Sequence, residues 1–530
     1  MAKGDEFDPK YNECIIKMAV TDDRKYTKAF AYDLLEGVKG KTLGEVDSSH
    51  QFARTLRSDK ITGIAGDVIE QSVFGYERDS KQECDIEIDG VLTELKTTGV
   101  RVPKSDLKNV NGKTGADYNV YLGAKEGISI TGVTFEPDIQ RDFTTSHFWE
   151  KSEHLLIVFY EYKSYDVVPA SEYAKFPIVD YCYNRFSDDE RSKLQNDWEI
   201  VRNYLQIIYA KYPTQEERNE NLQGFTHVLR PDLMLIELVP GFKKKSTGTY
   251  QKPRYRLKQT FVDYIVRGHF DKSRATTEVK LKESFSSFSQ LDARCHILSA
   301  KYKGMTFLQM KKLFAIGTEM STKDFGAKCV LKMFDTNCNR LNQISDFTKV
   351  GIIAKTITIT PTGGKTEDMK LKHIDFEEWA DRNVDFEESE LYAYFCEHSF
   401  LCPVFCEHDA EDSSKTTFEG FKRFSFDEAF IENEVKRTWE DSRNLIHRNK
   451  LEWEYIYDKD GKKRMNKSGA YMGAPNFPKS SDYEVFFRGG ADVSTDETRI
   501  EVVNGIKMLP QFFWLKGSYI ANKLQSLSYL

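Results

Sequence analysis

Hydrophobic and polar positions follow a clear pattern between residues 66 and 102. The run GDVIEQSVFG, residues 66–75, has the spacing of a short amphipathic helix and closes on Gly75, a residue type favoured just after a helix. Two β-rich runs follow, joined by Asp89-Gly90, a strong signal for a two-residue hairpin turn. The pattern therefore predicts a short helix and then a β-hairpin, with Asp85 on the first strand.

Side chains on the second hairpin strand should alternate between two faces. Glu94 and Lys96 then share one face, and Leu95 points to the core. Further along, the apolar run from His154 to Tyr162 predicts a buried strand.

A long helix is predicted to start at Ser187-Asp188-Asp189-Glu190, which has the form of a capping box, and to run to about Lys211. Its apolar residues fall on one face at helical spacing, so we expect them to pack in the core: Leu194, Trp198, Val201 and Leu205.

Three carboxylates and one ammonium come together on these neighbouring elements: Glu70, Asp85, Glu94 and Lys96. Carboxylate oxygens are the ligands that Mg²⁺ prefers, and a bound metal can activate water and neutralise charge on a phosphate. A lysine beside that water can orient it. The alternative for the hairpin residues alone is a solvated hairpin with a cross-strand ion pair. The helix glutamate and the ELKT run favour a metal-dependent phosphodiesterase.

GDVIEQSVFG followed by ELKTTGV resembles the mismatch-repair nickase MutH and the related two-domain type II restriction endonucleases that cut GATC. The resemblance implies an α/β (α+β) restriction-endonuclease fold, a mixed sheet flanked by helices. It also implies metal binding by the carboxylates of Asp85 and Glu94 and the carbonyl of Leu95, with Mg²⁺ as the cofactor and Mn²⁺ as a substitute. The implied catalytic residues are Glu70, Asp85, Glu94, Lys96 and Lys151, the last in SHFWEKSEHLLIVFY.

Candidate DNA contacts begin with a basic loop. Residues 241–259, GFKKKSTGTYQKPRYRLKQ, hold seven Lys or Arg and no acid, and this composition suits phosphate contacts. A solvated basic loop is the alternative. The resemblance adds Arg230 and Arg256 as DNA contacts. For Arg230 a base contact, a phosphate clamp and a structural ion pair are the alternatives. The predicted DNA-binding set is Lys60, Arg230, Lys243, Lys244, Lys245, Tyr255, Arg256, Lys258, Arg488, Trp514 and Lys516.

The second half of the chain repeats landmarks of the first. KGKTL at residue 39 recurs as KGMTF at residue 303, and the spacing from Arg230 to Leu257 equals that from Arg488 to Leu515. We therefore predict two tandem MutH-like domains, with a catalytic domain over 1–275, a linker over 276–300 and a second domain over 301–530.

The second copy has lost part of the expected chemistry. The counterpart of ELKTTGV is predicted to start at Ala354, so that alanine replaces the metal-binding glutamate. Asp346 is the candidate match for Asp85, and Glu397 lies near the position of Lys151. By resemblance, the second domain is inactive and binds a further DNA site as an allosteric arm.

Cysteine and histidine gather in the second half, at Cys396, His398, Cys402, Cys406 and His408. Ligands at short spacing can hold zinc. This stretch, however, coincides with an apolar strand of the first half, and its spacing fits no zinc pattern that we can justify. Zinc is therefore not the expected cofactor.

Composition sets the remaining bounds. A chain of 530 residues is too long to fold around a single hydrophobic core, so two or more domains are expected. The net charge of −7 does not by itself indicate nucleic acid, so the distribution of charge decides. We expect no signal peptide and no membrane span. Nine cysteines without a disulfide framework fit the cytoplasm.

The sequence therefore predicts a Mg²⁺-dependent type II endonuclease that cuts double-stranded DNA at GATC, a monomer in solution that self-associates on DNA. A strand nickase of the mismatch-repair kind and a non-catalytic DNA-binding regulator are the alternatives. The duplicated half disfavours the first, and the intact residue set disfavours the second.

Overall fold

The computed structural model describes residues 24–530 except 59, 60, 62, 78–82, 166, 167, 242–247, 249, 250, 275–278, 364–366, 383, 468, 491–494 and 496. The described chain forms two compact units. The N-terminal unit takes in residues up to 164, then 168–278 and 285–287, and the C-terminal unit takes in 165–167, 279–284 and 288–530.

The main sheet of the N-terminal unit is mixed. Its strands lie in the order β1-β2-β3-β6-β7, and β4 pairs with the far end of β3. The central pair, β3 and β6, is parallel, whereas β2 and β7 run antiparallel to their neighbours β3 and β6. The strands are β1 Lys25–Tyr26, β2 Ile86–Ile88, β3 Val91–Arg101, β4 Gly123–Ala124, β6 Leu155–Glu161 and β7 Ile178–Asn184.

A second, antiparallel sheet in the same unit has the order β5-β9-β8, from Ile128–Gly132, Arg254–Leu257 and Ile236–Val239. The α-helices are α2 Lys28–Val38, α3 Leu43–Val46, α4 Ile64–Val68, α5 Gly115–Asn119, α6 Phe135–Gln140, α7 His147–Ser152, α8 Asp188–Lys211, α9 Gln215–Leu229 and α10 Gln259–Phe270. A π-helix, η2 Ile69–Val73, continues α4, and short 3-10 turns lie at Gln51–Leu56, Lys104–Asn109, Phe143–Thr145 and Ala170–Lys175.

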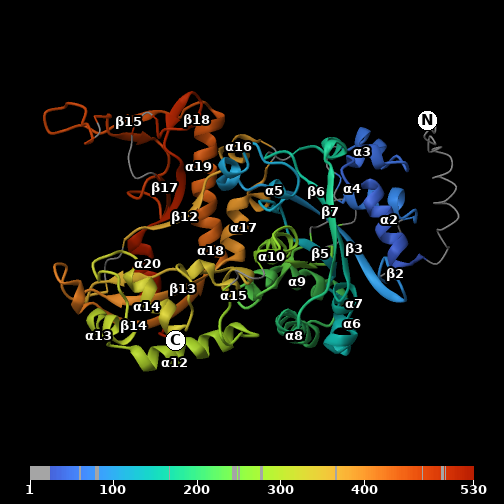
Figure 1. Cartoon of the computed structure of the whole chain (residues 1–530), viewed down its shortest axis with the longest axis horizontal. Helices are drawn as coiled ribbons and strands as arrows, with labels where there is room; N and C mark the ends of the chain where they lie inside the picture. The colour runs from blue at the N-terminus through green and yellow to red at the C-terminus, as the bar shows by residue number, and fades with distance from the viewer. Residues whose placement is uncertain are drawn as a thin grey trace, which may run out of the picture. The chain divides into compact units, whose positions relative to one another are not determined.

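Apolar side chains cover both faces of the main sheet. Leu95, Leu156 and Val158 point to one face and pack against residues of α2, α3 and α4. On the other face Phe159 packs against Phe270 of α10, with ring centroids 5.4 Å apart. Figure 1 shows this arrangement, with α2, α3 and α4 on one side of β3, β6 and β7 and α10 on the other. The sheet is therefore held rigidly between two helical layers, as the predicted fold requires.

The predicted hairpin is confirmed. Asp89 and Gly90 form its turn with φ angles of +48° and +80°, the left-handed pair that a type I′ turn needs. The Asp89 carboxylate also accepts a hydrogen bond from the backbone N–H of Lys28 at 3.2 Å. Asp85 lies one residue before β2, not on it, because pairing with β3 begins only at Ile86.

The predicted helices are confirmed too. The run at residues 66–75 forms α4 and η2, and Gly75 after them has a φ of +75°. Helix α8 begins with the Ser187–Glu190 capping box and ends at Lys211. Its predicted apolar stripe, Leu194, Trp198, Val201 and Leu205, is buried.

The C-terminal unit repeats the central strand pairings of the N-terminal unit, but its described strands include no counterparts of β1, β2 and β4. Strands β10 and β11 both pair parallel with β13, and β13 pairs antiparallel with β14. A smaller antiparallel sheet has the order β12-β20-β17. Thus β10 and β11 together correspond to β3, β13 to β6, and β14 to β7. The strands are β10 Ile352–Ala354, β11 Ile357–Ile359, β12 Met369–His373, β13 Ser399–Cys406, β14 Thr417–Ser425, β17 Val485–Gly489 and β20 Gln511–Leu515.

Two further strand pairs belong to this unit, β15 Trp453–Tyr455 with β16 Gly473–Pro475 and β18 Glu501–Val503 with β19 Ile506–Met508. The α-helices are α12 Phe288–Tyr302, α13 Phe307–Leu313, α14 Phe325–Met333, α15 Ser345–Lys349, α16 Phe376–Ala380, α17 Glu390–Glu397, α18 Glu428–Phe430, α19 Lys436–His447 and α20 Gly517–Gln525. A π-helix, Ile431–Val435, joins α18 to α19, and 3-10 turns lie at Leu341–Gln343, Phe386–Glu388 and Ser413–Lys415. The stretch expected as a linker, 276–300, includes most of α12.

Candidate active site

Five predicted catalytic residues come from four elements of the N-terminal unit. Glu70 lies on η2, Asp85 directly before β2, Glu94 and Lys96 on β3, and Lys151 on α7. Helix α7 is fixed by its N-cap Ser146, whose hydroxyl accepts from the N–H of Trp149 at 3.1 Å. The parallel pairing of β3 with β6, the strand that follows α7, brings Lys151 to Glu94.

The centre of the site is the carboxylate of Glu94, of which 1% is exposed. The Lys151 ammonium donates to both carboxylate oxygens, at 3.0 and 2.9 Å, and the Lys96 ammonium donates to Oε1 at 2.6 Å. A buried charge is stable only when it is paired and hydrogen-bonded. Two lysines therefore balance one buried carboxylate, and we call Glu94, Lys96 and Lys151 the Glu94 clamp.

Asp85 joins the clamp through the backbone. Its Oδ2 accepts from the N–H of Leu95 at 2.9 Å. Burial raises the pKa of Asp85 above its usual range, and the nearby Glu94 carboxylate adds to this, although Lys96 and Lys151 oppose it. A carboxylate held in such surroundings gains from a cation that stabilises its charged form.

Lys96 is held as an ammonium. Burial alone would lower its pKa, but the Glu94 and Asp85 carboxylates outweigh burial and raise the pKa above the usual value. Glu70 also contributes to this rise, so its carboxylate lies within electrostatic reach of Lys96. At neutral pH Lys96 is therefore a hydrogen-bond donor and a positive charge, and it cannot serve as a general base.

The donor set fits a hard divalent cation. Asp85 and Glu94 supply carboxylate oxygens, and the main chain at Leu95 supplies a carbonyl between Glu94 and Lys96. Oxygen ligands of this kind suit Mg²⁺ or Mn²⁺ better than zinc.

Two neighbours of the site were not predicted from the sequence. The ring of Tyr76 is buried beneath the Arg24 guanidinium, 4.6 Å from its centroid, and the pKa of Tyr76 is raised by burial first and then by Asp85 and Glu70. The Cys84 thiol donates to the carbonyl of Glu150 at 3.3 Å, and burial raises its pKa to about 12. Sequence position was the one signal that could have pointed to Tyr76 and Cys84, because each lies near a predicted site residue. Neither tyrosine nor cysteine is a residue type specific for a site of this kind.

The C-terminal unit lacks this constellation, and the strand registers show what replaces it. The β6–β7 ladder shifts between Phe159 and Tyr160, and the β13–β14 ladder shifts between Val404 and Phe405. Aligning the shifts places Phe400 at the position of Leu155. Leu155 pairs with Glu94, and Phe400 pairs with Ile353. Ile353, not Ala354, therefore takes the place of Glu94, and Lys355 takes that of Lys96.

A hydrogen bond supports this register. Asn342 Oδ1 accepts from the N–H of Ala354 at 3.3 Å, as Asp85 accepts from Leu95. The predicted match of Asp346 with Asp85 is therefore wrong. Asp346 lies on α15 and accepts from the N–H of Leu281 at 2.7 Å.

The remaining two positions are also changed. Helices α4–η2 and α14 both end on a buried phenylalanine followed by a residue with positive φ, which places Val330 at the position of Glu70. Lys151 lies five residues after Ser146, the N-cap of α7, and Tyr394 lies five residues after Ser389, the N-cap of α17. Tyr394 therefore takes the place of Lys151. Glu397 lies further along α17 and is not the match by this count. None of the residues at these positions is a carboxylate.

The predicted DNA contacts of the N-terminal unit include residues that the structure does not describe, arginines that are partly exposed, and side chains that are buried. Lys60, Lys243, Lys244 and Lys245 lie outside the described residues. Arg256 is part-exposed on β9 and pairs with Glu237 at 2.7 Å. Arg230, at the end of α9, lies 2.6 Å from His227 Nδ1.

Tyr255 and Lys258 require correction. The Tyr255 side chain has no exposed surface and packs on Phe148, with ring centroids 5.0 Å apart. The Lys258 ammonium is buried and donates to the carbonyl of Leu233. The Tyr255 side chain points into the core because it lies on the covered face of β9, whereas Lys258 follows β9 and is buried at the N-cap of α10. Neither side chain therefore contacts DNA directly.

The predicted DNA contacts of the C-terminal unit gather on one sheet. The Arg488 guanidinium on β17 lies over the Trp514 ring of β20, 4.8 Å from its centroid, and pairs with Asp368 at 2.8 Å. Trp514 Nε1 donates to the carbonyl of Arg488 at 3.3 Å. Lys516 lies directly after β20, 3.7 Å from Glu484. This surface is partly exposed and carries both charge and an aromatic face.

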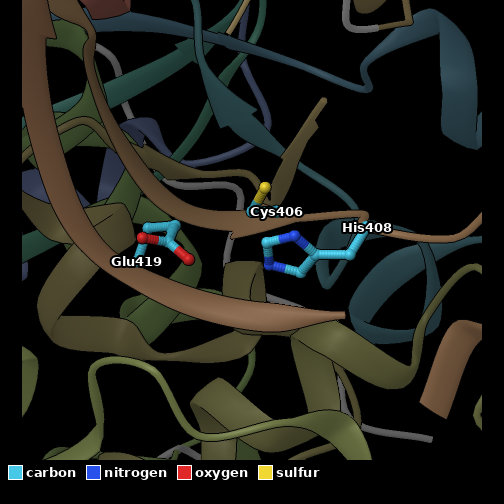
Figure 2. Close-up of side chains that lie close together, drawn as sticks. All are labelled: Cys406, His408 and Glu419. Atoms are coloured by element: carbon cyan, nitrogen blue, oxygen red, sulfur yellow. The ribbon is translucent and has the colours of Figure 1, made fainter. Parts of the chain in front are cut away.

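The Cys/His stretch is largely a core strand. Cys402 is buried on β13, and His398 Nδ1 lies 2.9 Å from the carbonyl of Tyr394. Cys406, His408 and Glu419 lie with ligand atoms within 4.8 Å of one another, the one such group found among the described residues. Figure 2 shows these three side chains at neighbouring strand ends. His408 Nε2 lies 2.9 Å from Thr417 Oγ1, which donates to Glu419 at 2.6 Å, so a hydrogen-bond chain already joins two of the three.

With this geometry established, comparison with known proteins is informative. Residues 74–197 match the sequence family described as DNA mismatch repair enzyme MutH. The matched segment contains Asp85, Glu94, Lys96 and Lys151, and the resemblance inferred from the sequence is confirmed. The chain is also similar to the type II restriction enzyme Sau3AI of Staphylococcus aureus, with 23% identity over 537 residues. That alignment covers 94% of this chain and 99% of the relative.

A helix that could cross a membrane would have to be long and almost free of charge. No helix among the described residues meets both conditions.

Proposed function

We propose that this protein is a sequence-specific type II DNA endonuclease that uses Mg²⁺, with Mn²⁺ as a substitute, and that its N-terminal unit cuts the phosphodiester bond. The observation that carries the proposal is the Glu94 clamp beside Asp85, inside the segment that matches MutH. The full-length similarity to a type II restriction enzyme supports the same reaction class. Enzymes of this fold generally use divalent metal ions.

In this proposal each side chain has one task. The carboxylates of Asp85 and Glu94 and the carbonyl of Leu95 hold the cation. When bound, the cation lowers the pKa of a coordinated water and offsets charge on the scissile phosphate. The Lys96 ammonium orients the attacking water and stabilises the charge that develops on the phosphate. Lys151 keeps the Glu94 carboxylate in place, and Glu70 supports the water network.

The target that we propose is GATC, by resemblance to the two-domain restriction enzymes. Each chain then has one active site, since Val330, Asn342, Ile353 and Lys355 provide no carboxylate in the C-terminal unit. Cutting both strands would need a second chain on the DNA or two successive nicks. The C-terminal unit would bind a further DNA site through Arg488, Trp514 and Lys516, and the protein would act in the cytoplasm.

The test is digestion of supercoiled plasmid with Mg²⁺, followed by sequencing of the product ends. We expect linear fragments with ends at GATC, and roughly a 10³-fold loss of rate in Glu94→Gln because the substitution removes a carboxylate ligand of the cation that stabilises the transition state. Glu87→Gln, which changes an acid on the neighbouring strand β2, is the matched control and should keep activity. A nicked circle as the final product would favour a strand nickase, and equal rates for Glu94→Gln and wild type would refute the site.

A further inference from the structure

The C-terminal unit carries an arm that has no counterpart in the N-terminal unit. Between its long helix α19 and strand β17, residues 453–475 form paired strands, which we call the β15–β16 arm. At the corresponding place, between α8 and β8, the N-terminal unit has helix α9. The base of the arm is the β15–β16 ladder, and isolated bridges Tyr457–Lys463 and Met465–Tyr471 extend it (Figure 1).

Large apolar side chains are exposed along the arm. Tyr455, Ile456, Tyr457, Met465 and Tyr471 have between 37% and 56% of their surface exposed. Single exposed apolar residues are ordinary on a protein surface. Five of them within 17 residues, on one small set of strands, are typical of a surface that a partner covers.

Charge indicates which partner. Over residues 453–475 the described chain has five basic residues, Lys459, Lys462, Lys463, Arg464 and Lys467, and three acids, Glu454, Asp458 and Asp460, a net charge of +2 on a chain of net charge −7. Glu454 pairs with Lys479, which lies outside the arm. All five basic side chains are exposed, and none forms an ion pair with a described residue. The Lys463 ammonium lies 3.5 Å from the ring centroid of Tyr455 and 5.8 Å from that of Tyr471. Basic groups interleaved with tyrosine rings suit a phosphate backbone next to sugars and bases.

The arm is fastened to the strand that carries Arg488. Phe477, just after the arm, stacks on Phe487 of β17 with ring centroids 4.6 Å apart. Arg499, from the loop before β18, lies over Trp453 at the base of the arm, 4.6 Å from its ring centroid, and donates to the carbonyl of Tyr471 at 3.1 Å. The arm and Arg488 are therefore attached to the same strand, β17, so that one ligand could contact both.

We propose that the β15–β16 arm binds the sugar-phosphate backbone of duplex DNA, with Lys462, Lys463 and Arg464 at phosphates and Tyr455 and Tyr471 against the groove wall. The inference rests on the proposed function for the presence of DNA. It adds a contact surface outside the catalytic site and outside the positions predicted from the sequence. A second copy of this chain is the competing partner for the same surface.

Binding of a fluorescent GATC duplex over a series of salt concentrations tests the arm. Every protein carries Glu94→Gln, so that the DNA is not cut. The arm variant adds Lys462→Gln, Lys463→Gln and Arg464→Gln, and the control adds Lys301→Gln, Lys303→Gln and Lys312→Gln, three exposed lysines of the same unit. If three phosphate contacts are lost, the slope of log K against log salt should fall by about 2.7 in the arm variant alone.

Tyr455→Ala with Tyr471→Ala tests the aromatic part. We expect roughly tenfold weaker binding with an unchanged salt slope, and recovery in the double Phe variant, because packing against the sugars of the groove wall needs the ring and not the hydroxyl. Thermal unfolding confirms that each variant is folded.

The outcomes separate the two proposals. If the parent Glu94→Gln protein does not bind the duplex, the proposed function fails. If it binds and the arm variant keeps the same affinity and salt slope, the arm inference fails. If the arm variant loses self-association in sedimentation velocity while DNA binding is unchanged, the arm binds another copy of the chain, and the inference is overturned.

Discussion

At the scale of single residues, the notable feature is a fully buried carboxylate between two lysines. Such a group is expensive to desolvate, and a protein bears this cost only where the pairing is complete. The sequence predicted that Glu94 and Lys96 share a face because alternation along a strand is a local rule. Lys151 lies 57 residues away in the chain. Spacing cannot predict that contact, and only the family resemblance indicated it.

Replacing Lys151 by methionine should expose the cost of the unpaired charge. We expect Lys151→Met to lower the free energy of unfolding by about 3 kcal/mol, because it removes one partner of a buried ion pair. In a Glu94→Gln background the same change should cost much less, since the charge that it leaves unpaired is gone. Chemical denaturation of the four proteins of this double-mutant cycle measures the coupling. Additive effects would show that the two side chains do not interact as described.

Residue composition also misled the prediction at two positions. Tyr255 and Lys258 belong to a basic, aromatic run that is typical of DNA contacts. The structure turns both side chains inward, where Lys258 satisfies the carbonyl of Leu233. Composition reports residue types, but it does not show that Tyr255 lies on the covered face of β9 or that Lys258 is buried at the N-cap of α10.

At the scale of elements, the β2–β3 hairpin sets the spacing between Asp85 and Glu94. Helix ends, the hairpin turn and the capping box were all predicted, because each depends on a few adjacent residues. The register of the second copy was predicted one residue away, with Ala354 in place of Ile353. A one-residue shift moves every side chain to the opposite face. The register is read from an irregularity on β13 and β14 beside Gly420, far along the chain from Ala354, so the residues around Ala354 do not reveal it.

The hairpin turn gives a direct test at this scale. Gly90 has a φ of +80°, so Gly90→Ala should cost about 1 kcal/mol of stability through backbone strain. Its Cβ would meet nothing within 4 Å, so packing would not contribute. Gly37→Ala on helix α2 is the control, because a Cβ there also meets nothing and helix propensity predicts a gain of up to about 1 kcal/mol. Thermal unfolding compares them, and a stabilised Gly90→Ala would contradict the turn.

At the scale of the whole molecule, the chain contains two units that share their central strand pairings, and the candidate metal-binding residues lie in one of them. The repeated landmarks in matching order predicted two tandem domains of one kind, and the structure has two compact units with shared central pairings. Which chemistry the second copy kept could not be predicted, because the answer depends on strand register. Lys355 remains in place of Lys96 but donates to the carbonyl of Lys370, and burial lowers its pKa. Among the described residues no carboxylate pairs with Lys355, which serves as a donor to the main chain.

The central claim is that the Asp85 and Glu94 carboxylates hold the catalytic cation and that the C-terminal unit holds none. Isothermal titration calorimetry of the full chain with Mn²⁺ tests it most directly, comparing wild type with Glu94→Gln and Asp85→Asn. We predict a heat of binding in wild type that both substitutions abolish, while both variants unfold cooperatively. Unchanged Mn²⁺ binding in either variant would place the cation elsewhere and contradict the account.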